Sequence, residues 1–462
     1  MDATFAFAKN IVDLKYEQIP QLAVEAEKKQ LLDTLGVALA GSSKDGVKEL
    51  FEVVKSWGGK RQSTIIGYGI RLPAPHSAQV NATMAHALDY DDGHEAALVH
   101  TGAVVVPTCL AIAEQKGKVS GKGYIAAAAL ATDLMCRLGL STRPNGNIAG
   151  SGWHFTPLYG FLGAAAGAGR ILGLNEDQMV NALGIAYHQT AGNMQCIKDG
   201  ALTKRMGPGF AARGGIAAAL MAQRGITGAK NCLEGQAGLF TLYHEGDYDA
   251  KALVQDLGIR FESVNVSMKP YPCCGIGHIF IDLALALAQE QQIRTGDIGE
   301  IKAIGGESPR SLSEPLEIKR NPRNGVDAQF SLPWGVATAL VRGTPSMEHY
   351  TDEAVKNDDI LTVSRKVSYE VDSSLTRHGA FGPGILRVVT KEGKEYIRRM
   401  ESPRGSQERP LTFNDCVTKF FDCVSYSMRP VSKERAKKVV GMIERLEKLN
   451  DVTQIIRLVH KE

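Results

Sequence analysis

Residues 160–171 read GFLGAAAGAGRI, and residues 209–222 read GFAARGGIAAALMA. Both runs consist mostly of alanine and glycine, with only a few large apolar side chains between them. Small side chains allow the axes of packed helices to approach closely. The sequence around these runs does not alternate between strand-like and helix-like segments, so a doubly wound sheet is not expected. The two runs therefore predict a dense core of closely packed helices.

Helical signals extend through the first part of the chain. Leu31, Leu35 and Leu39 recur at helical spacing, and the run Gly41-Ser42-Ser43 that follows them is a helix stop. Asn175, with Gln178 three residues later, matches a capping box at the start of another helix. We therefore expect a mainly α protein with a large all-helical domain over residues 1–266.

The character of the sequence changes after Met268. Three segments there are rich in β-branched residues and partly alternate: 298–306, 361–371 and 385–400. Within the last of them, Glu392-Gly393 is typical of a hairpin turn. Helical patterns accompany these strands over 279–292 and 334–341. The sequence predicts a smaller α+β domain over residues 267–403.

A helical pattern returns from Asn414 onward, where Val439, Ile443 and Leu446 share one face. We expect residues 404–462 to rejoin the first domain. The α+β domain is then an insertion within an all-helical one.

Composition excludes several classes of function. The 462 residues are 44% hydrophobic and 22% charged, with a net charge of +3 and no basic block. This balance argues against a nucleic-acid or membrane-surface partner. The opening residues MDATFAFAKN lack the pattern of a secretory signal, and the apolar stretch 155–174 is interrupted by glycines and Arg170, so we expect it to be a buried helix. The eight cysteines form no CxxC pair, which favours free thiols and a cytoplasmic location.

The densest chemistry in the chain lies in residues 86–107, HALDYDDGHEAALVHTGAVVVP, which hold three aspartates and three histidines near their start. This run suits either proton transfer or metal binding. For a metal, Asp89, Asp92, His94 and His100 offer suitable ligands, although no HExxH or EF-hand spacing is present. A metal-dependent hydrolase is therefore an alternative. The structural alternative is that Asp89, three residues after His86, only packs beside it on one helical face and has no chemical role.

Two histidines are candidates for proton transfer. His100 precedes a helix expected to start near Gly102, and a helix N-terminus favours the neutral ring. His154 lies between Trp153 and Phe155, where burial would also keep an imidazole neutral and able to accept a proton. The alternative for His154 is a core histidine with a satisfied hydrogen bond.

Two later segments carry cations beside expected helix starts. In DGALTKRMGPGFAARGG, Lys204 and Arg205 precede Pro208, which suits the first turn of a helix. In SMKPYPCCGIGHIFID, Lys269 precedes two prolines, and His278 falls in the first turn of the next helix. Each lysine alone could be a solvated surface residue, His278 a capped helix-end histidine, and the two thiols buried small hydrophobes. Together the two segments suit a substrate with two or more carboxylates.

Six motifs in order, HALDYDDGH, HTGAVVVP, GWHFT, GLNEDQMVNALGIA, DGALTKRMGPGFAARGG and KPYPCC, resemble the MmgE/PrpD family over nearly the whole chain. The family includes 2-methylcitrate dehydratase, cis-aconitate decarboxylase and iminodisuccinate epimerase. The resemblance implies a large helical domain with an inserted α+β lid, a cofactor-independent site and a homodimer.

Carried over by motif, the resemblance places the family's histidine pair on His100 and His154. It places the substrate-side lysines on Lys204 and Lys269, and an acidic residue on Asp89. We add Arg205, Cys274 and His278 to the substrate side, because they adjoin these lysines or lie in the same motif. No metal ligand is assigned. The decarboxylase branch would have threonine in place of Gly93 and histidine near Cys274, so these departures weaken that reading.

The sequence thus predicts a lyase that needs no cofactor and abstracts a proton next to a carboxylate of a small di- or tricarboxylic acid. Dehydration of a 2-methylcitrate-like or citrate-like hydroxy acid is the first expectation. Decarboxylation of the cis-aconitate type and epimerisation of a dicarboxylate use the same groups and stay open. A helical module that only binds carboxylates is a further alternative, as is the metal-dependent hydrolase.

Overall fold

Two helices made largely of small residues lie at the centre of the helical part of the protein. They are α7 (Phe155–Leu172) and α10 (Thr203–Gln223), which pack against each other in the computed structural model. A Cβ atom at Gly215 would lie 2.4 Å from the Cβ of Ala164, closer than real side chains approach. A Cβ at Gly160 would lie 3.0 Å from the Cβ of Ala211. The predicted close packing of small-residue helices is confirmed.

The structure describes residues 2–142, 152–377 and 381–460. The chain divides into two compact units, one formed by residues 1–266 with 412–462 and the other by residues 267–411. The first unit is built of helices with only two-residue strands, and the second combines helices with a sheet. The expected mainly α fold class is confirmed.

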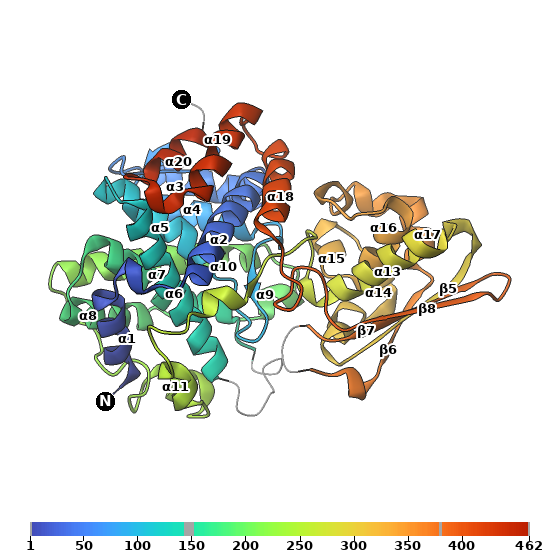
Figure 1. The fold of residues 1–462 in the computed structure, drawn as a ribbon, viewed down its shortest axis with the longest axis horizontal. Coiled ribbons are helices and arrows are strands. Elements are labelled where there is room, and N and C mark those ends of the chain that lie inside the picture. The colour runs from blue at the N-terminus through green and yellow to red at the C-terminus, as the bar shows by residue number, and fades with distance from the viewer. Residues whose placement is uncertain (1, 143–151, 378–380, 461–462) are drawn as a thin grey trace. The chain divides into compact units, whose positions relative to one another are not determined.

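The helices of the first unit run in many directions around α7 and α10 (Figure 1). Besides those two, its helices are α1 (Ala3–Asp13), α2 (Gln21–Gly41), α3 (Val47–Trp57), α4 (Ala74–His86), α5 (Gly102–Lys116), α6 (Gly121–Ser141), α8 (Glu176–Tyr187), α9 (Gln195–Lys198), α11 (Leu239–His244), α12 (Ala250–Val254), α18 (Phe413–Ser425), α19 (Lys433–Glu444) and α20 (Thr453–Leu458). Its short strands are β1 (Ser63–Thr64), β2 (Arg71–Leu72) and β3 (Gly93–His94), and β4 (Val266–Ser267) lies at the junction of the units.

Local sequence signals explain several of these helix ends. The Asn175 side chain accepts a hydrogen bond from the Gln178 backbone, and the Gln178 side chain accepts one from the Asn175 backbone, which completes the predicted capping box of α8. Helix α2 ends at Gly41, as the Gly-Ser-Ser run predicted. The position predicted for Pro208 was wrong, because it lies inside α10 and not in its first turn. Pro208 is buried there, and its nitrogen donates no hydrogen bond within the helix.

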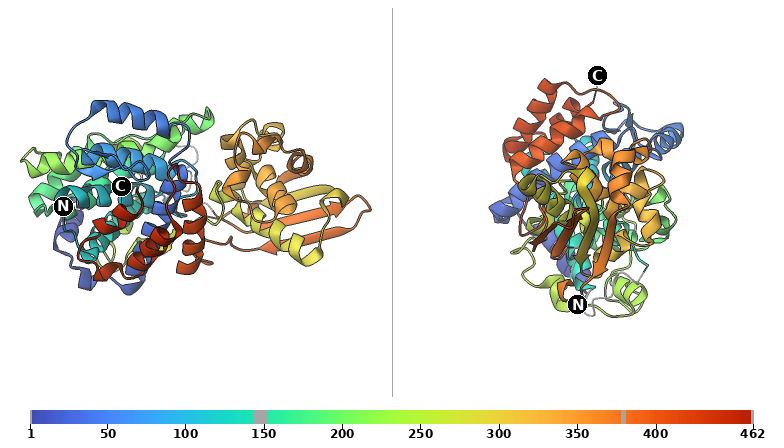
Figure 2. Two further views of the ribbon diagram at one scale, coloured as in Figure 1. Left: turned by 90° about the horizontal axis from the view of Figure 1, so that it is seen from above. Right: turned by 90° about the vertical axis from the view of Figure 1, so that its right-hand side faces the viewer.

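The last helices of the chain lie beside helices from its beginning (Figure 2). Helix α18 packs on α2, and α20 packs on α5. A short 3₁₀ helix over Leu446–Lys448 contacts the start of α6, where the backbone N–H of Gly121 donates to the carbonyl of Leu449 at 2.8 Å. The C-terminal segment is therefore part of the same hydrophobic core as the N-terminal helices.

The second unit contains a four-stranded sheet with the order β6-β5-β7-β8. Strand β5 runs parallel to β6 and antiparallel to β7, and β7 and β8 form a hairpin whose turn includes Gly393 at φ 84°. Helices α13 and α16 pack on this sheet, with Trp334 fully buried between them and their neighbours. The elements are β5 (Ile298–Gly305), β6 (Val367–Val371), β7 (Gly384–Thr390), β8 (Glu395–Met400), α13 (His278–Gln291), α14 (Leu316–Arg320), α15 (Gly325–Gln329), α16 (Leu332–Arg342) and α17 (Asp358–Ser364).

Most of the elements predicted for this region are confirmed, including β5, the β7–β8 hairpin, α13 and α16. The strand predicted over 361–371 was wrong in its first part, because residues up to Ser364 belong to α17. The side chain of Asn357 caps that helix by accepting a hydrogen bond from the Ile360 backbone at 3.1 Å. The helix turns Ile360 and Val363 toward the core, which β-branched composition alone did not reveal.

Among the described residues, one helix, α6, is long and apolar enough to cross a membrane by length and composition alone. However, 89% of its apolar window is buried inside the fold, which is the packing expected of a core helix. Its Arg137 is fully buried and pairs with Asp133 at 2.7 Å. The segment predicted to be a buried helix, now α7, is also almost wholly buried.

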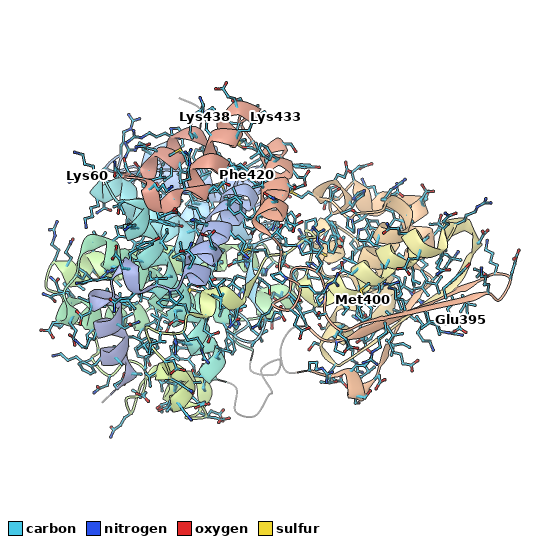
Figure 3. The ribbon with its side chains drawn as sticks, in the orientation of Figure 1. Lys60, Glu395, Met400, Phe420, Lys433 and Lys438 are labelled. Carbon is cyan, nitrogen blue, oxygen red and sulfur yellow. The ribbon has the colours of Figure 1, made fainter. Side chains whose placement is uncertain are left out.

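The side chains follow the same division between core and surface. Phe420 on α18 is fully buried, whereas Lys433 and Lys438 on α19 point outward (Figure 3). On β8, alternate residues such as Glu395 are exposed. This pattern places one face of each C-terminal helix on the core.

The contact between Gly121 and the C-terminal segment generates a prediction about stability. A Cβ at Gly121 would lie 1.6 Å from the carbonyl oxygen of Leu446, so Gly121→Ala forces the two backbones apart. We expect this substitution to lower the free energy of unfolding by about 1–3 kcal/mol. Urea unfolding followed by circular dichroism measures the change.

The matched control is Gly441→Ala on α19, where a Cβ would have no atom within 4 Å. Alanine favours helix over glycine by about 1 kcal/mol, so this variant should be unchanged or more stable. Equal stability of the Gly121→Ala variant and the natural protein would contradict the proposed close contact.

Candidate functional site

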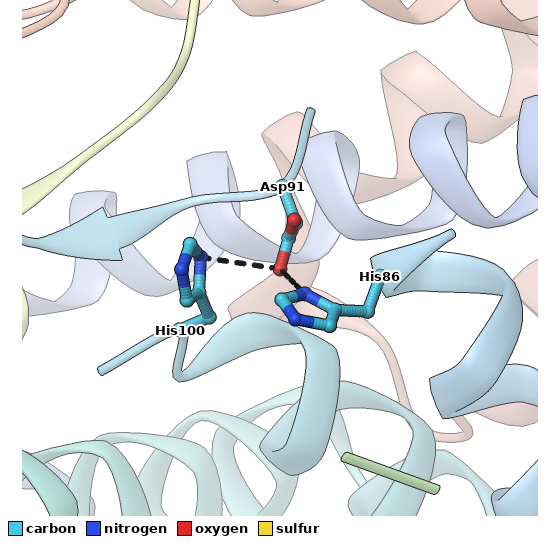
Figure 4. Close-up of side chains that lie close together, drawn as sticks. All are labelled: His86, Asp91 and His100. Atoms are coloured by element: carbon cyan, nitrogen blue, oxygen red, sulfur yellow. Dashed lines mark hydrogen bonds and ion pairs between the residues drawn. The ribbon is translucent and has the colours of Figure 1, made fainter. Parts of the chain in front are cut away.

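Three side chains of the first unit form a tight hydrogen-bonded group at the end of α4 (Figure 4). His86 is the last residue of α4, and its Nδ1 lies 2.7 Å from Oδ2 of Asp91. The Nδ1 of His100, two residues before α5, lies 3.4 Å from the same oxygen. His86 and Asp91 are buried, whereas 21% of the His100 side chain is exposed. Asp91 therefore orients two imidazoles, one of which is accessible to solvent.

The tautomers of the two rings follow from their partners. The Nδ1 of His100 lies 2.6 Å from the backbone carbonyl of Asp92, and a carbonyl oxygen can only accept. The hydrogen of a neutral His100 ring is therefore on Nδ1, and the lone pair is on Nε2. In the same way, His86 donates from Nδ1 to the Asp91 carboxylate. Both neutral rings thus present Nε2 as a proton acceptor.

The carboxylate of Asp92 caps the N-terminus of α5. Its two oxygens accept from the backbone N–H of Gly102 at 3.0 and 2.9 Å. Oδ2 also accepts from Thr101 at 3.0 Å and from the side chain of Gln30 on α2 at 2.8 Å. Burial, and then the charge of Asp91, raises the pKa of Asp92 to about 6. This residue fixes the loop that carries His100, so its role is to position that loop.

His154 and Lys204 complete the group from other elements. His154 is the N-cap residue of α7, is buried, and its ring stacks on that of His86 with 6.1 Å between centroids. Lys204, in the first turn of α10, forms an ion pair with Asp89. The charges of Lys204 and Asp89 both act on His154. The structure therefore brings together four residues predicted from sequence: His100, His154, Lys204 and Asp89.

The electrostatics of the group keep its buried imidazoles neutral. Burial, against the opposing effect of Asp91, lowers the pKa of His86 to about 4. Burial and the nearby ammonium of Lys204 hold the pKa of His154 well below its usual value. Burial by itself would raise the pKa of Asp91. The contacts of Asp91 with His86 and His100 outweigh burial and hold this pKa well below the ordinary range. At neutral pH, therefore, Asp91 is an ionised carboxylate and the rings of His86 and His154 are neutral.

The same three residues pass a geometric test for a metal site, since their ligand atoms lie within 4.8 Å of one another. His86 and His100 both use Nδ1 as a hydrogen-bond donor, so a metal ion held by these two rings would have to bind their Nε2 atoms. The alternative set of metal ligands has separate partners: Asp92 caps α5, Asp89 pairs with Lys204, and His94 lies 3.4 Å from Glu262.

The remaining predicted residues are Arg205 in the first unit, and Lys269, Cys274 and His278 in the second. Arg205 is buried and donates to the backbone carbonyl of Asp45 at 2.7 Å. Within the second unit Lys269 is buried, the backbone N–H of Cys274 donates to the carbonyl of Gln329 at 2.9 Å, and the ring of His278 lies 3.2 Å from the carbonyl of Cys273.

Comparison with known proteins identifies the family. The MmgE/PrpD N-terminal domain matches residues 6–251, and the MmgE/PrpD C-terminal domain matches residues 271–445. The chain belongs to the MmgE/PrpD family. Cis-aconitate decarboxylase of Aspergillus terreus is 25% identical over 97% of this chain and 94% of its own length. The proteins of the same name from Homo sapiens and Mus musculus are 24% and 23% identical, each over 98% of this chain and 94% or 93% of their own. The family and these relatives support an enzyme of the lyase type.

Sequence reasoning did not assign two members of this hydrogen-bonded group, His86 and Asp91. Both lie in the acidic run that drew attention, but their pairing depends on the backbone between them. Asp89 adopts φ 51°, in the left-handed region, and this turns the chain after α4 so that Asp91 faces back toward His86. The spacing of five residues across the end of a helix was the only available signal.

The neutral state of buried His86 predicts a pH dependence of stability. An exposed histidine titrates near pH 6.5, whereas folded His86 stays neutral down to about pH 4, so the unfolded chain binds a proton that the folded chain does not. The free energy of unfolding should therefore fall as the pH drops from 6.5 to about 4, by up to about 3 kcal/mol from this residue. Urea unfolding of the natural protein and of His86→Gln at several pH values measures this contribution.

Glutamine at position 86 retains an N–H donor for Asp91 but does not titrate. The stability difference between the two proteins should shrink or reverse at low pH. Parallel stability curves across this window would show that His86 is not held neutral.

Proposed function

We propose that this protein is a cofactor-independent lyase that moves a proton at a carbon next to a carboxylate of a small di- or tricarboxylic acid. The observation that carries the proposal is the convergence of neutral imidazoles beside a lysine ammonium. A carbon-bound proton next to a carboxylate is weakly acidic, so its removal needs a positioned base and a cation that stabilises the developing charge. The site contains groups of both kinds.

His100 is the proposed base or acid that faces the substrate. Its Nδ1 is held by the Asp92 carbonyl and lies near Asp91, which directs Nε2 away from these groups, and part of its side chain is exposed. His154 is the proposed partner for the second proton transfer, because its ring is kept neutral by burial and by Lys204. The proposal allows either order: His100 removes the proton and His154 delivers one, or the reverse.

Lys204 is the proposed carboxylate-binding cation. Its side chain is 13% exposed, and an ammonium group has three N–H donors, so it can donate to a substrate carboxylate as well as to Asp89. Asp89 then orients the ammonium or a substrate hydroxyl. Lys269, Arg205, Cys274 and His278 remain proposed contributors to substrate binding.

Dehydration of a 2-methylcitrate-like or citrate-like hydroxy acid is the first proposed reaction. One histidine, as the neutral imidazole, takes the proton from carbon, and the electron pair forms the carbon–carbon double bond. The β-hydroxyl leaves as water with a proton from the other histidine, which starts as an imidazolium and ends neutral. Each step uses one proton acceptor or donor of the pair. Return of the proton to the opposite face of the carbon would instead epimerise the acid.

Decarboxylation is the second candidate, favoured by the names of the relatives described above. A carboxylate leaves as carbon dioxide, its electron pair moves into the conjugated system, and an imidazolium delivers a proton to carbon. The same two histidines can carry out either reaction, so the structure of the substrate determines which reaction occurs.

Substitution of the two histidines tests the roles proposed for them. His100→Ala and His154→Ala should each lower turnover by about 10²–10⁴-fold, because each removes one positioned acid or base. His188→Ala, which changes an exposed histidine of the same unit, is the matched control and should retain full activity. Turnover measurements and circular dichroism on all three proteins separate loss of chemistry from loss of fold. Near-normal turnover in either active-site variant would overturn the assignment.

Proton NMR in heavy water identifies the reaction. The protein is incubated with a panel of citrate-like and aconitate-like acids, and the spectra are followed for alkene products, loss of a carboxylate and exchange of carbon-bound protons for deuterium. We expect deuterium to enter carbon even where no net product accumulates. Absence of exchange and of product with every acid of the panel would contradict the proposed lyase.

Chelation distinguishes the lyase from the metal-dependent hydrolase. We expect exhaustive dialysis against a chelator to leave turnover unchanged, because the proposed proton transfers use imidazoles and an ammonium group and need no metal ion. Activity lost on chelation and restored by Mg²⁺, Mn²⁺ or Zn²⁺ would favour the hydrolase. We also propose a homodimer, as the family resemblance implies, which light scattering measures.

A further inference from the structure

Three successive aspartates or their carbonyls in the segment that links α4 to β3 contact residues of the candidate site. Asp89 pairs with Lys204, Asp91 contacts both His86 and His100, and the carbonyl of Asp92 accepts from His100. Tyr90 lies between the first two of these aspartates and is itself buried. A shift of the Tyr90 backbone would therefore move the carboxylates of Asp89 and Asp91 together.

A lysine from the C-terminal segment holds this backbone. Lys419 on α18 donates from Nζ to the carbonyl oxygen of Tyr90 at 2.7 Å. The same ammonium lies 3.9 Å from the centroid of the Tyr90 ring, and 2.7 Å from Oδ1 of Asp33 on α2. The Lys419 side chain is 5% exposed and that of Asp33 is fully buried. One buried cation thus contacts the main chain and the ring of the same residue.

The contact between α18 and α2 determines how Lys419 reaches the segment. A Cβ at Gly36 of α2 would lie 3.2 Å from Cδ2 of Phe420, the neighbour of Lys419, so the two helices meet at a residue without a side chain. Asp33 lies on the same helix, one turn before Gly36. A buried ammonium needs a counter-charge and hydrogen-bond acceptors, and here Asp33 and Tyr90 supply them.

We propose that Lys419 is a positioning residue of the candidate active site, which sets the placement of Asp91 between the two imidazoles by holding the carbonyl of Tyr90. The catalytic part of this proposal rests on the proposed function, whereas the placement of Asp91 does not. Lys419 is buried and contacts the segment through Tyr90, so it acts through that segment and does not bind the substrate. The C-terminal helix thereby contributes to a site that lies more than 300 residues earlier in the chain.

The experiment uses the double variant Asp33→Asn/Lys419→Met. Lys419→Met alone would leave the buried carboxylate of Asp33 without its counter-charge, whereas changing both partners leaves no unpaired buried charge and should preserve the fold. Lys433→Met, on the exposed face of α19, is the matched control. Circular dichroism and urea unfolding establish that each protein is folded.

The first readout is the proton NMR signal of the hydrogen that His86 donates to Asp91, observed downfield of the amide region in water. This signal is assigned to His86 by its absence from the spectrum of the His86→Gln variant. We expect this signal to shift or disappear in the folded double variant and to stay unchanged in Lys433→Met. An unchanged signal in the folded double variant would overturn the proposal, because Asp91 would then keep its place without Lys419.

The second readout separates kcat from KM. A base displaced by about 1 Å loses on the order of 10²-fold in rate, so we expect kcat to fall on that scale. The change in KM measures how far Asp89, the partner of Lys204, moves with the same segment. Unchanged kcat in the folded double variant would also overturn the proposal. If the natural protein turns over none of the acids, the proposed function fails, and the NMR signal alone decides the role of Lys419.

Discussion

Three carboxylates within four residues, Asp89, Asp91 and Asp92, are buried in the helical unit, and each must find its own hydrogen-bond donors. A buried carboxylate without such donors would destabilise the fold or take up a proton. The donors come from different helices: the end of α4, the start of α5, Gln30 on α2 and Lys204 on α10. Satisfying the carboxylates therefore requires these helices to hold fixed relative positions. The geometry of the candidate site is a consequence of this requirement.

Much of the fold could be predicted because the signals are local. The capping box at Asn175, the helix stop at Gly41 and the hairpin turn at Gly393 each depend on residues that are close in sequence. The small residues of α7 and α10 also predicted their close approach, since no other composition permits it. Residues 361–364 were mistaken for strand because β-branched residues are common to strands and to buried helices, and the capping role of Asn357 was overlooked.

The candidate site was only partly predictable. The density of aspartates and histidines indicated the segment. The other motifs of the family resemblance indicated Lys204 and His154. The pairing of His86 with Asp91 depends on a left-handed residue at Asp89, a conformation that the sequence does not specify. The contact of Lys419 with Tyr90 joins residues more than 300 positions apart, and no pattern of composition or spacing connects them. Such long-range contacts require the coordinates.

The arrangement of the helical unit has a consequence for how the chain is made. Its helices come from both ends of the sequence, whereas residues 267–411 are continuous. During synthesis on the ribosome, the sheet-containing unit can complete its own core while the N-terminal helices still lack α18, α19 and α20. The apolar faces of α2, α5 and α6 stay uncovered until residues 413–458 emerge. A nascent chain at that point exposes apolar surface of the kind that chaperones bind, and a stop before α18 would leave that surface exposed permanently.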